Sequence, residues 1–127
     1  MLSYPNVFLY LSGDSHDNRV SFYKGKSSGS GFWHIETSSL IDYPQQTRLL
    51  EVVYNGEGSG SIYSTMLDFN AKKGSLPYLA RALSLIDIQY DKIGDDNAGI
   101  KEDRNVILKF KIPKEISEVF DKYEVEK

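Results

Sequence analysis

The sequence has no cysteine among its 127 residues, and this absence removes several classes of protein at once. Disulfide-stapled folds, thiolate nucleophiles and zinc sites built on cysteine are excluded, and a reducing compartment is favoured. No apolar run approaches the ~20 residues that a membrane-spanning helix needs, and no basic segment precedes a long apolar run near Met1. We therefore expect a cytoplasmic protein that does not bind a membrane.

The two glycine-rich segments lack the neighbours that nucleotide chemistry needs. Residues 25–31 contain Gly-Lys-Ser, but Val20 occupies the position of the first glycine of a phosphate-binding loop, and the segment leads into a predicted strand. Phosphate-binding loops instead open the N-terminus of a helix. Residues 56–60 lie between predicted strands, as in a kinase, but the motifs His-Arg-Asp and Asp-Phe-Gly are missing. We interpret both segments as hairpin tips and expect no cofactor.

The remaining composition is that of an ordinary globular domain. Hydrophobic residues make up 40% of the chain, charged residues 26% and aromatic residues 13%, which is enough apolar material for a packed core. A length of 127 residues lies close to the commonest domain size. We expect residues 1–127 to form a single domain whose folding needs no metal ion.

Hydrophobic periodicity predicts six strands. They are short apolar or alternating runs bounded by turn residues, at residues 7–11, 19–24, 32–36, 47–54, 61–69 and 106–112. Asn55-Gly56 predicts a hairpin with a type I′ turn between the fourth and fifth strands. On the fifth strand we expect one alternating set to face the core, namely Tyr63, Thr65, Leu67 and Phe69.

Two apolar stripes at helical spacing complete the pattern. The first follows Ser75, which can cap a helix, and comprises Leu76, Leu79, Ala80, Leu83 and Ile86. The second follows Pro113 and comprises Ile116, Val119, Phe120 and Tyr123. Runs of strands followed by helices favour an α+β fold. We predict a mainly antiparallel sheet of about five to six strands with both helices packed on one face.

His34 and Glu36 form a candidate catalytic pair. Their spacing places an imidazole and a carboxylate on one face of a strand, where they could act as a general base and its orienting partner in a small hydrolase. The pair also resembles half of a zinc deaminase site, but no cysteine follows to complete it. Cross-strand hydrogen bonding is the more common role of such a pair in a sheet. We therefore favour a structural interpretation and assign no catalytic or metal-binding residue.

Aromatic and basic side chains suggest a second alternative. Tyr23 and Trp33 would lie with Lys24 and Arg48 on one face of the sheet, where rings can stack on the bases of a single-stranded nucleic acid. Core packing beneath a helix is the simpler explanation for the same rings. The net charge of −3 also disfavours nonspecific nucleic-acid binding, which depends on neutralising phosphates.

An acidic segment is the most informative feature of the chain. Residues 1–86 carry seven basic and seven acidic side chains, whereas residues 87–127 carry eight and eleven, so the whole negative excess lies in the second part. Its spacing does not match a calcium-binding loop, and a solvated loop is the simple alternative. We interpret six residues of this segment as a candidate binding surface for a basic protein: Asp87, Asp91, Asp95, Asp96, Glu102 and Asp103.

Together these patterns favour a noncatalytic protein-binding domain. We expect an inhibitor or an immunity protein (an antitoxin) that uses the acidic segment to occlude the basic active site of a toxin. The alternatives left open are a single-stranded nucleic-acid binding module and, less favoured, a hydrolase that uses His34 and Glu36.

Overall fold

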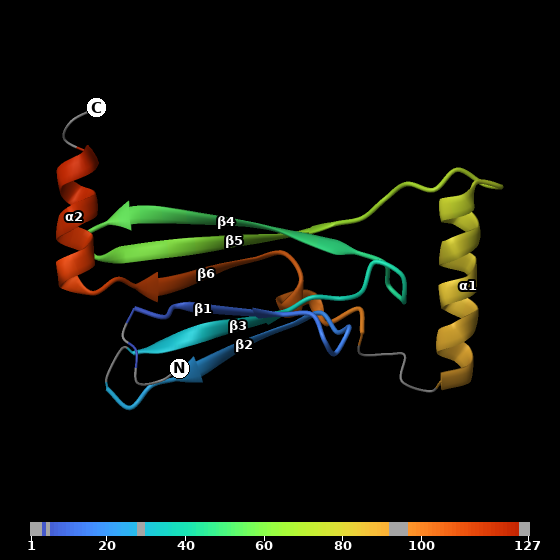
Figure 1. Cartoon of the computed structure of the whole chain (residues 1–127), viewed down its shortest axis with the longest axis horizontal. Coiled ribbons are helices and arrows are strands. Elements are labelled where there is room, and N and C mark those ends of the chain that lie inside the picture. The colour runs from blue at the N-terminus through green and yellow to red at the C-terminus, as the bar shows by residue number, and fades with distance from the viewer. Residues whose placement is uncertain (1–3, 5, 28–29, 92–96, 125–127) are drawn as a thin grey trace.

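The computed structural model describes residues 4, 6–27, 30–91 and 97–124 (Figure 1). It has six strands, two α-helices and one short 3₁₀ helix (η1) within these residues. The α+β class predicted from the sequence is confirmed. In chain order the elements are β1 (Leu9–Ser12), β2 (Arg19–Lys24), β3 (Gly31–Glu36), β4 (Thr47–Gly56), β5 (Ser59–Leu67), α1 (Leu76–Asp91), η1 (Lys101–Asp103), β6 (Val106–Lys111) and α2 (Lys114–Glu124).

The strands form two three-stranded sheets, so the prediction of one sheet of five to six strands is wrong. Sheet A has the order β1-β3-β2, and sheet B has the order β4-β5-β6. Because β3 pairs with β1 on one side and with β2 on the other, neither of its edges is free to accept β4. β4 therefore begins a new sheet by pairing with β5. The β1–β3 pairing is parallel, whereas the other described pairings are antiparallel.

The core lies between the inner faces of the two sheets. Ile35 of β3 packs with Ile62 of β5 and Leu108 of β6, and all three are buried. Burying a side chain of this size contributes ~1.5–3 kcal/mol to the free energy of unfolding. The packing of these three residues therefore stabilises the contact between the two sheets. Partly buried apolar side chains surround them: Phe8, Leu9, Val20, Trp33, Leu50, Val106 and Phe110.

The orientation predicted for β5 is wrong. Ile62 and Ser64 are buried, whereas the opposite set, Tyr63, Thr65, Leu67 and Phe69, is exposed. Both alternating sets of this strand contain apolar residues, so alternation by itself did not decide which set faces inward. The partner strands decide it, because Ile62 lies opposite Leu108 and both contact Ile35.

The predicted hairpin between β4 and β5 is present, but its turn lies two residues further along the chain. Gly56 pairs with Ser59, which leaves Glu57 and Gly58 as the central turn residues. Their φ angles are 52° and 68°, and a type I′ turn needs positive φ at both central positions. The register shift between Tyr54 and Gly56 accommodates the displaced turn.

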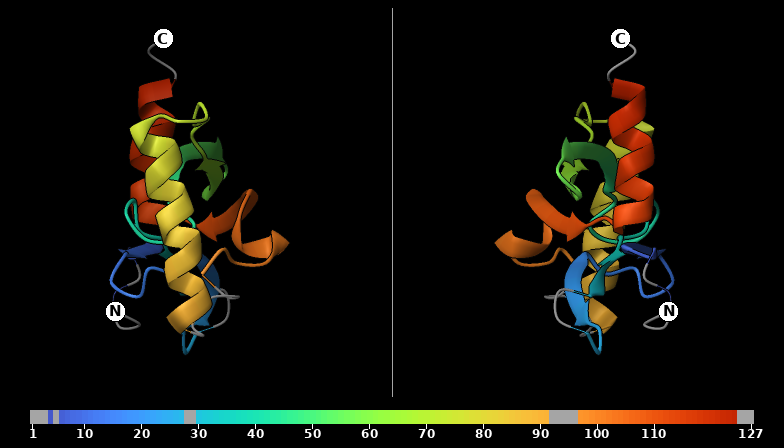
Figure 2. Two further views of the ribbon diagram at one scale, coloured as in Figure 1. Left: turned by 90° about the vertical axis from the view of Figure 1, so that its right-hand side faces the viewer. Right: turned by 90° about the vertical axis from the view of Figure 1, so that its left-hand side faces the viewer.

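The two helices lie at opposite ends of the sheets, so the prediction that both pack on one face is wrong (Figure 1, Figure 2). The expected N-cap of α1 is confirmed, since Ser75 Oγ accepts a hydrogen bond from the Tyr78 amide at 3.4 Å. The apolar stripe predicted to be buried is instead exposed, and Leu83 is 56% exposed. Within the described residues, no helix has both the length and the apolar character to cross a membrane.

Candidate functional site

The outer face of sheet B gathers exposed apolar side chains from three adjacent strands. Strand register places Glu51 opposite Tyr63, and Tyr63 opposite Ile107. Exposed fractions of the large apolar members range from 39% for Tyr63 to 59% for Ile107. We define the outer face by eight exposed side chains of this alternation: Leu49, Glu51 and Val53 on β4, Tyr63, Thr65 and Leu67 on β5, and Ile107 and Lys109 on β6. Ser61 shares the alternation but is buried.

Neither helix covers this outer face. α1 and α2 flank the ends of the sheets, and the strands of sheet B run between them (Figure 1). A contiguous apolar patch of this kind on a folded protein generally marks an interaction site. Glu51 lies between Leu49 and Val53 on the same strand, so it places one carboxylate among the apolar side chains.

A polar network holds β4 in place behind this face. The Arg48 guanidinium donates hydrogen bonds to Ser64 Oγ at 2.7 Å, to the Asp103 carbonyl at 2.8 Å and to the Arg104 carbonyl at 3.2 Å. Burial lowers the pKa of Arg48; the Asp103 carboxylate opposes this and the Arg104 charge adds to it. An arginine remains charged at neutral pH. The network therefore holds a cation on the inner side of sheet B.

Asn18 connects this network to sheet A. Its side-chain oxygen accepts hydrogen bonds from the Ser38 amide at 3.1 Å and from Arg48 at 3.4 Å. Its side-chain nitrogen donates to Gln46 Oε1 at 3.4 Å. Because Asn18 is almost fully buried, these bonds satisfy polar atoms that would otherwise be costly to bury.

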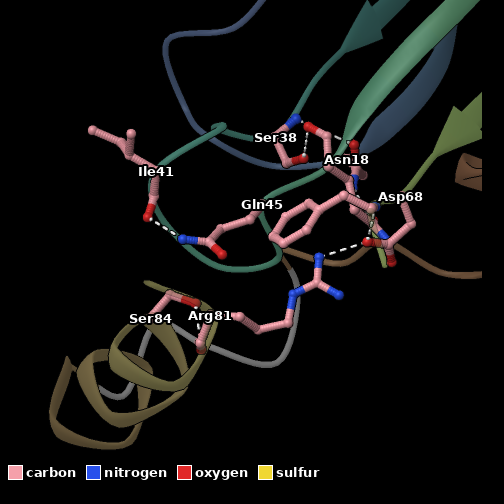
Figure 3. Close-up of polar contacts among 9 residues, drawn as sticks. Asn18, Ser38, Ile41, Gln45, Asp68, Arg81 and Ser84 are labelled. Carbon is pink, nitrogen blue, oxygen red and sulfur yellow. Dashed lines mark hydrogen bonds and ion pairs between the residues drawn. The ribbon is translucent and has the colours of Figure 1, made fainter. Parts of the chain in front are cut away.

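The same network continues to α1 through Asp68 (Figure 3). Asp68 accepts hydrogen bonds from Arg81 at 2.5 Å and from Gln46 Nε2 at 3.0 Å. Partial burial acts to raise the pKa of Asp68, but the hydrogen bonds from Arg81, Gln46 and the Phe69 amide outweigh it, so the pKa is lowered. The carboxylate is therefore ionised at neutral pH and holds the polar side of α1.

The acidic residues predicted to bind a partner do not form one described cluster. Asp87 lies exposed on α1 and Glu102 lies exposed on η1. Asp103 is engaged within the chain, because its carboxylate accepts hydrogen bonds from the Val20 amide at 2.8 Å and the Ile100 amide at 3.2 Å. Asp95, Asp96 and the side chain of Asp91 lie outside the described residues. Their role in recognition stays a prediction.

His34 and Glu36 share a face of β3, and the structure adds Ser12 to them. His34 Nε2 and Ser12 Oγ are hydrogen-bonded at 2.7 Å, and His34 Nδ1 lies 3.6 Å from Glu36 Oε1. Ser12, His34 and Glu36 are thus arranged in the same order as the serine nucleophile, the histidine base and the orienting carboxylate of a catalytic triad. However, 3.6 Å exceeds hydrogen-bond distance, and Glu36 accepts from Ser15 Oγ at 2.8 Å. A structural network explains these contacts equally well.

The surface proposed for stacking nucleic-acid bases does not form as predicted. Phe22 lies opposite Trp33, and Tyr23 lies opposite Phe32, so Tyr23 and Trp33 occupy opposite faces of sheet A. Trp33 packs against the core, and its Nε1 donates to the Lys109 carbonyl at 2.9 Å. The prediction placed the adjacent residues Tyr23 and Lys24 on one face, although successive side chains of a strand point to opposite faces. It also lacked the β2–β3 register, which places the rings of Tyr23 and Trp33 on different sides.

A further hollow lies where α2 meets the inner face of sheet B. This apolar pocket has a volume of about 330 Å³. The rings of Phe8 and Phe110 stack there with centroids 4.1 Å apart. Tyr54 and Asp121 hydrogen-bond to each other between β4 and α2. The pocket is lined mainly by apolar side chains, as the core is, and it offers few polar groups that could orient a reacting substrate.

No metal centre is evident among the described residues, since no three of their His, Asp and Glu side chains are grouped closely enough to hold an ion. Comparisons with protein-family models, with curated proteins and with solved structures each found no match to this chain.

Sequence reasoning missed the outer face, although one signal could have revealed it. Glu51 shares its strand face with Leu49 and Val53, and a lone carboxylate is costly to bury. That side of β4 should therefore have been assigned to solvent. Tyr63 and Thr65 lie opposite Glu51 and Leu49 in the hairpin, so they should face solvent as well.

Proposed function

We propose that this chain is a noncatalytic protein-binding domain and that it binds its partner through the outer face of sheet B. The exposed row of apolar side chains on three adjacent strands carries the proposal. Aromatic anchors dominate the energetics of many interfaces, and Tyr63 lies in the middle strand of this face. Burying the face against a partner would remove an apolar surface that is otherwise left in contact with water.

We further propose that the partner has a basic surface. Glu51 supports this, because a carboxylate among apolar side chains needs a cation or hydrogen-bond donors when a partner desolvates it. The exposed Asp87 and Glu102 would add attraction at longer range. An inhibitor or an immunity protein that blocks a basic active site would use such a surface.

Site-specific photo-crosslinking tests this proposal. A photoreactive amino acid at Thr65, on the outer face, should capture a partner from the source cells, whereas the same group at the exposed Lys114 on α2 should not. The captured protein is then purified and its affinity for the chain is measured across a salt series. Glu51→Gln should weaken binding and flatten the salt dependence, since it removes one charge. If Glu51→Gln leaves the salt dependence of the affinity unchanged, a basic contact at this position is excluded.

The 2.7 Å contact between Ser12 and His34 favours a hydrolase as the second candidate function. An active serine would be labelled by a fluorophosphonate probe, and Ser12→Ala would abolish both labelling and ester hydrolysis while the thermal unfolding temperature stays unchanged. The protein-binding proposal predicts no labelling above that of the Ser12→Ala variant. Labelling that is specific to Ser12 would overturn the noncatalytic assignment.

A further inference from the structure

α1 carries an exposed apolar stripe with a regular spacing. We define the α1 seam as Leu76, Leu79, Leu83, Ile86 and Tyr90, whose exposed fractions are 81%, 53%, 56%, 51% and 84%. Successive members are separated by three, four, three and four positions. This is the spacing of the a and d positions of a coiled coil. The seam is therefore shaped to meet another helix.

The opposite side of α1 attaches the helix to the rest of the chain. Arg81 lies almost opposite the centre of the seam at 3.6 residues per turn, and it contacts Asp68 at 2.5 Å. The same guanidinium lies 4.0 Å from the centre of the Phe69 ring, and the neighbouring Ser84 is buried. Figure 3 shows this polar side turned toward Asp68 and Gln45. α1 thus uses its polar side internally and leaves its apolar side to solvent.

We infer that two copies of this chain pair through their α1 seams. A coiled-coil seam needs a second helix whose side chains interlock with its own, and α1 of another copy supplies an identical one. The other α-helix that the structure describes is not available for this role, because α2 lies at the far end of the sheets (Figure 1) and its Ile116 and Phe120 line the apolar pocket. Identical surfaces meet across a two-fold axis, which is the commonest symmetry of soluble oligomers.

The chemistry of the seam permits this approach. Its five members carry no charge, so two identical seams do not repel each other. Ala80 and Ala82, beside the seam, are short and leave room for the partner helix. Sixteen residues of helix extend ~24 Å, and pairing two such seams removes on the order of 1000 Å² from water, the lower bound for a specific interface.

Analytical ultracentrifugation of the full chain tests this inference, with Leu83→Glu as the disruptive variant. Leu85→Glu is its matched control, because Leu85 is also exposed on α1 but lies off the seam. Wild type and Leu85→Glu should dimerise, whereas Leu83→Glu should raise the dimer dissociation constant ~100-fold or more, since two buried leucines are lost per dimer. Circular dichroism verifies that each variant keeps its fold.

A second measurement covers the case in which Leu83→Glu does not fold. Because the chain has no cysteine, Leu83→Cys introduces a single thiol, which a short bis-maleimide should cross-link into dimers more efficiently than it does with Leu85→Cys. Equal cross-linking at both positions, or a wild-type chain that stays monomeric at all concentrations, overturns the inference.

The inference is carried by the apolar seam of α1, whereas the proposed function is carried by the outer face of sheet B, with Asp87 of α1 adding only longer-range attraction. Ile107→Glu separates the two, since it places a charge on the outer face and should leave the dimer intact. Dissociation by Ile107→Glu to the same degree as by Leu83→Glu would instead mean that α1 covers the outer face of the second copy, and would overturn the pairing of the two seams.

Discussion

Replacing Ile62 with alanine is expected to lower the free energy of unfolding by ~2–5 kcal/mol, the usual cost of a large-to-small change in a packed core. Ile62 is 0% exposed and contacts Ile35 and Leu108 between the two sheets. Chemical denaturation monitored by circular dichroism measures the change.

Ile107→Ala is the matched control for this prediction. Ile107 has the same side chain and lies on the neighbouring strand β6, but it is 59% exposed on the outer face. Its replacement should change stability by no more than ~0.5–1 kcal/mol. Equal losses for the two variants would mean that the inner and outer faces of sheet B have been assigned incorrectly.

Arg48→Met should cost about 2–4 kcal/mol of stability, although it retains most of the aliphatic stem. Removing the guanidinium leaves the Asp103 carbonyl without this donor and leaves Ser64 Oγ and the Arg104 carbonyl only the 3.3 Å hydrogen bond that joins them. Each buried group that loses its partner costs ~1–3 kcal/mol. Arg48→Lys should recover only part of the loss, because one ammonium group does not reproduce the planar fork of donors.

Arg19→Met provides the comparison at an exposed site. The Arg19 side chain is 53% exposed and lies 3.6 Å from Asp17, and exposed ion pairs contribute ~0–1 kcal/mol. Its loss should therefore be small and should shrink further in high salt. A cost for Arg48→Met no larger than that for Arg19→Met would show that the buried network contributes little to stability.

Local patterns predicted the secondary structure but not the pairing of the strands. The alternating pattern of residues 19–24 predicts β2 at its observed bounds. The cap at Ser75 and the hairpin before β5 are also predictable, because each depends on neighbouring residues. The division into two sheets depends on β1 returning to pair in parallel with β3. No short-range signal encodes that contact.

The same limit explains what was missed at the sites. Ser12 meets His34 only because β1 pairs with β3, so the contact cannot be inferred from the spacing of His34 and Glu36. The period of the apolar residues on α1 predicts the stripe, but its placement in the core depends on the assumption that such stripes are covered by another element. Periodicity identifies the stripe, but only the tertiary structure shows that α1 is held by its polar side through Arg81.

The most direct test of the binding account is the dissociation constant of the purified complex, measured for Tyr63→Ala and Tyr123→Ala beside wild type. Both tyrosines are exposed, but Tyr63 lies on the outer face of sheet B and Tyr123 lies on α2. Losing a central aromatic contact costs ~2 kcal/mol or more, so Tyr63→Ala should raise the constant ~30-fold or more, while Tyr123→Ala should leave it nearly unchanged. An unchanged constant for Tyr63→Ala, or equal changes for the two variants, would contradict binding through this face.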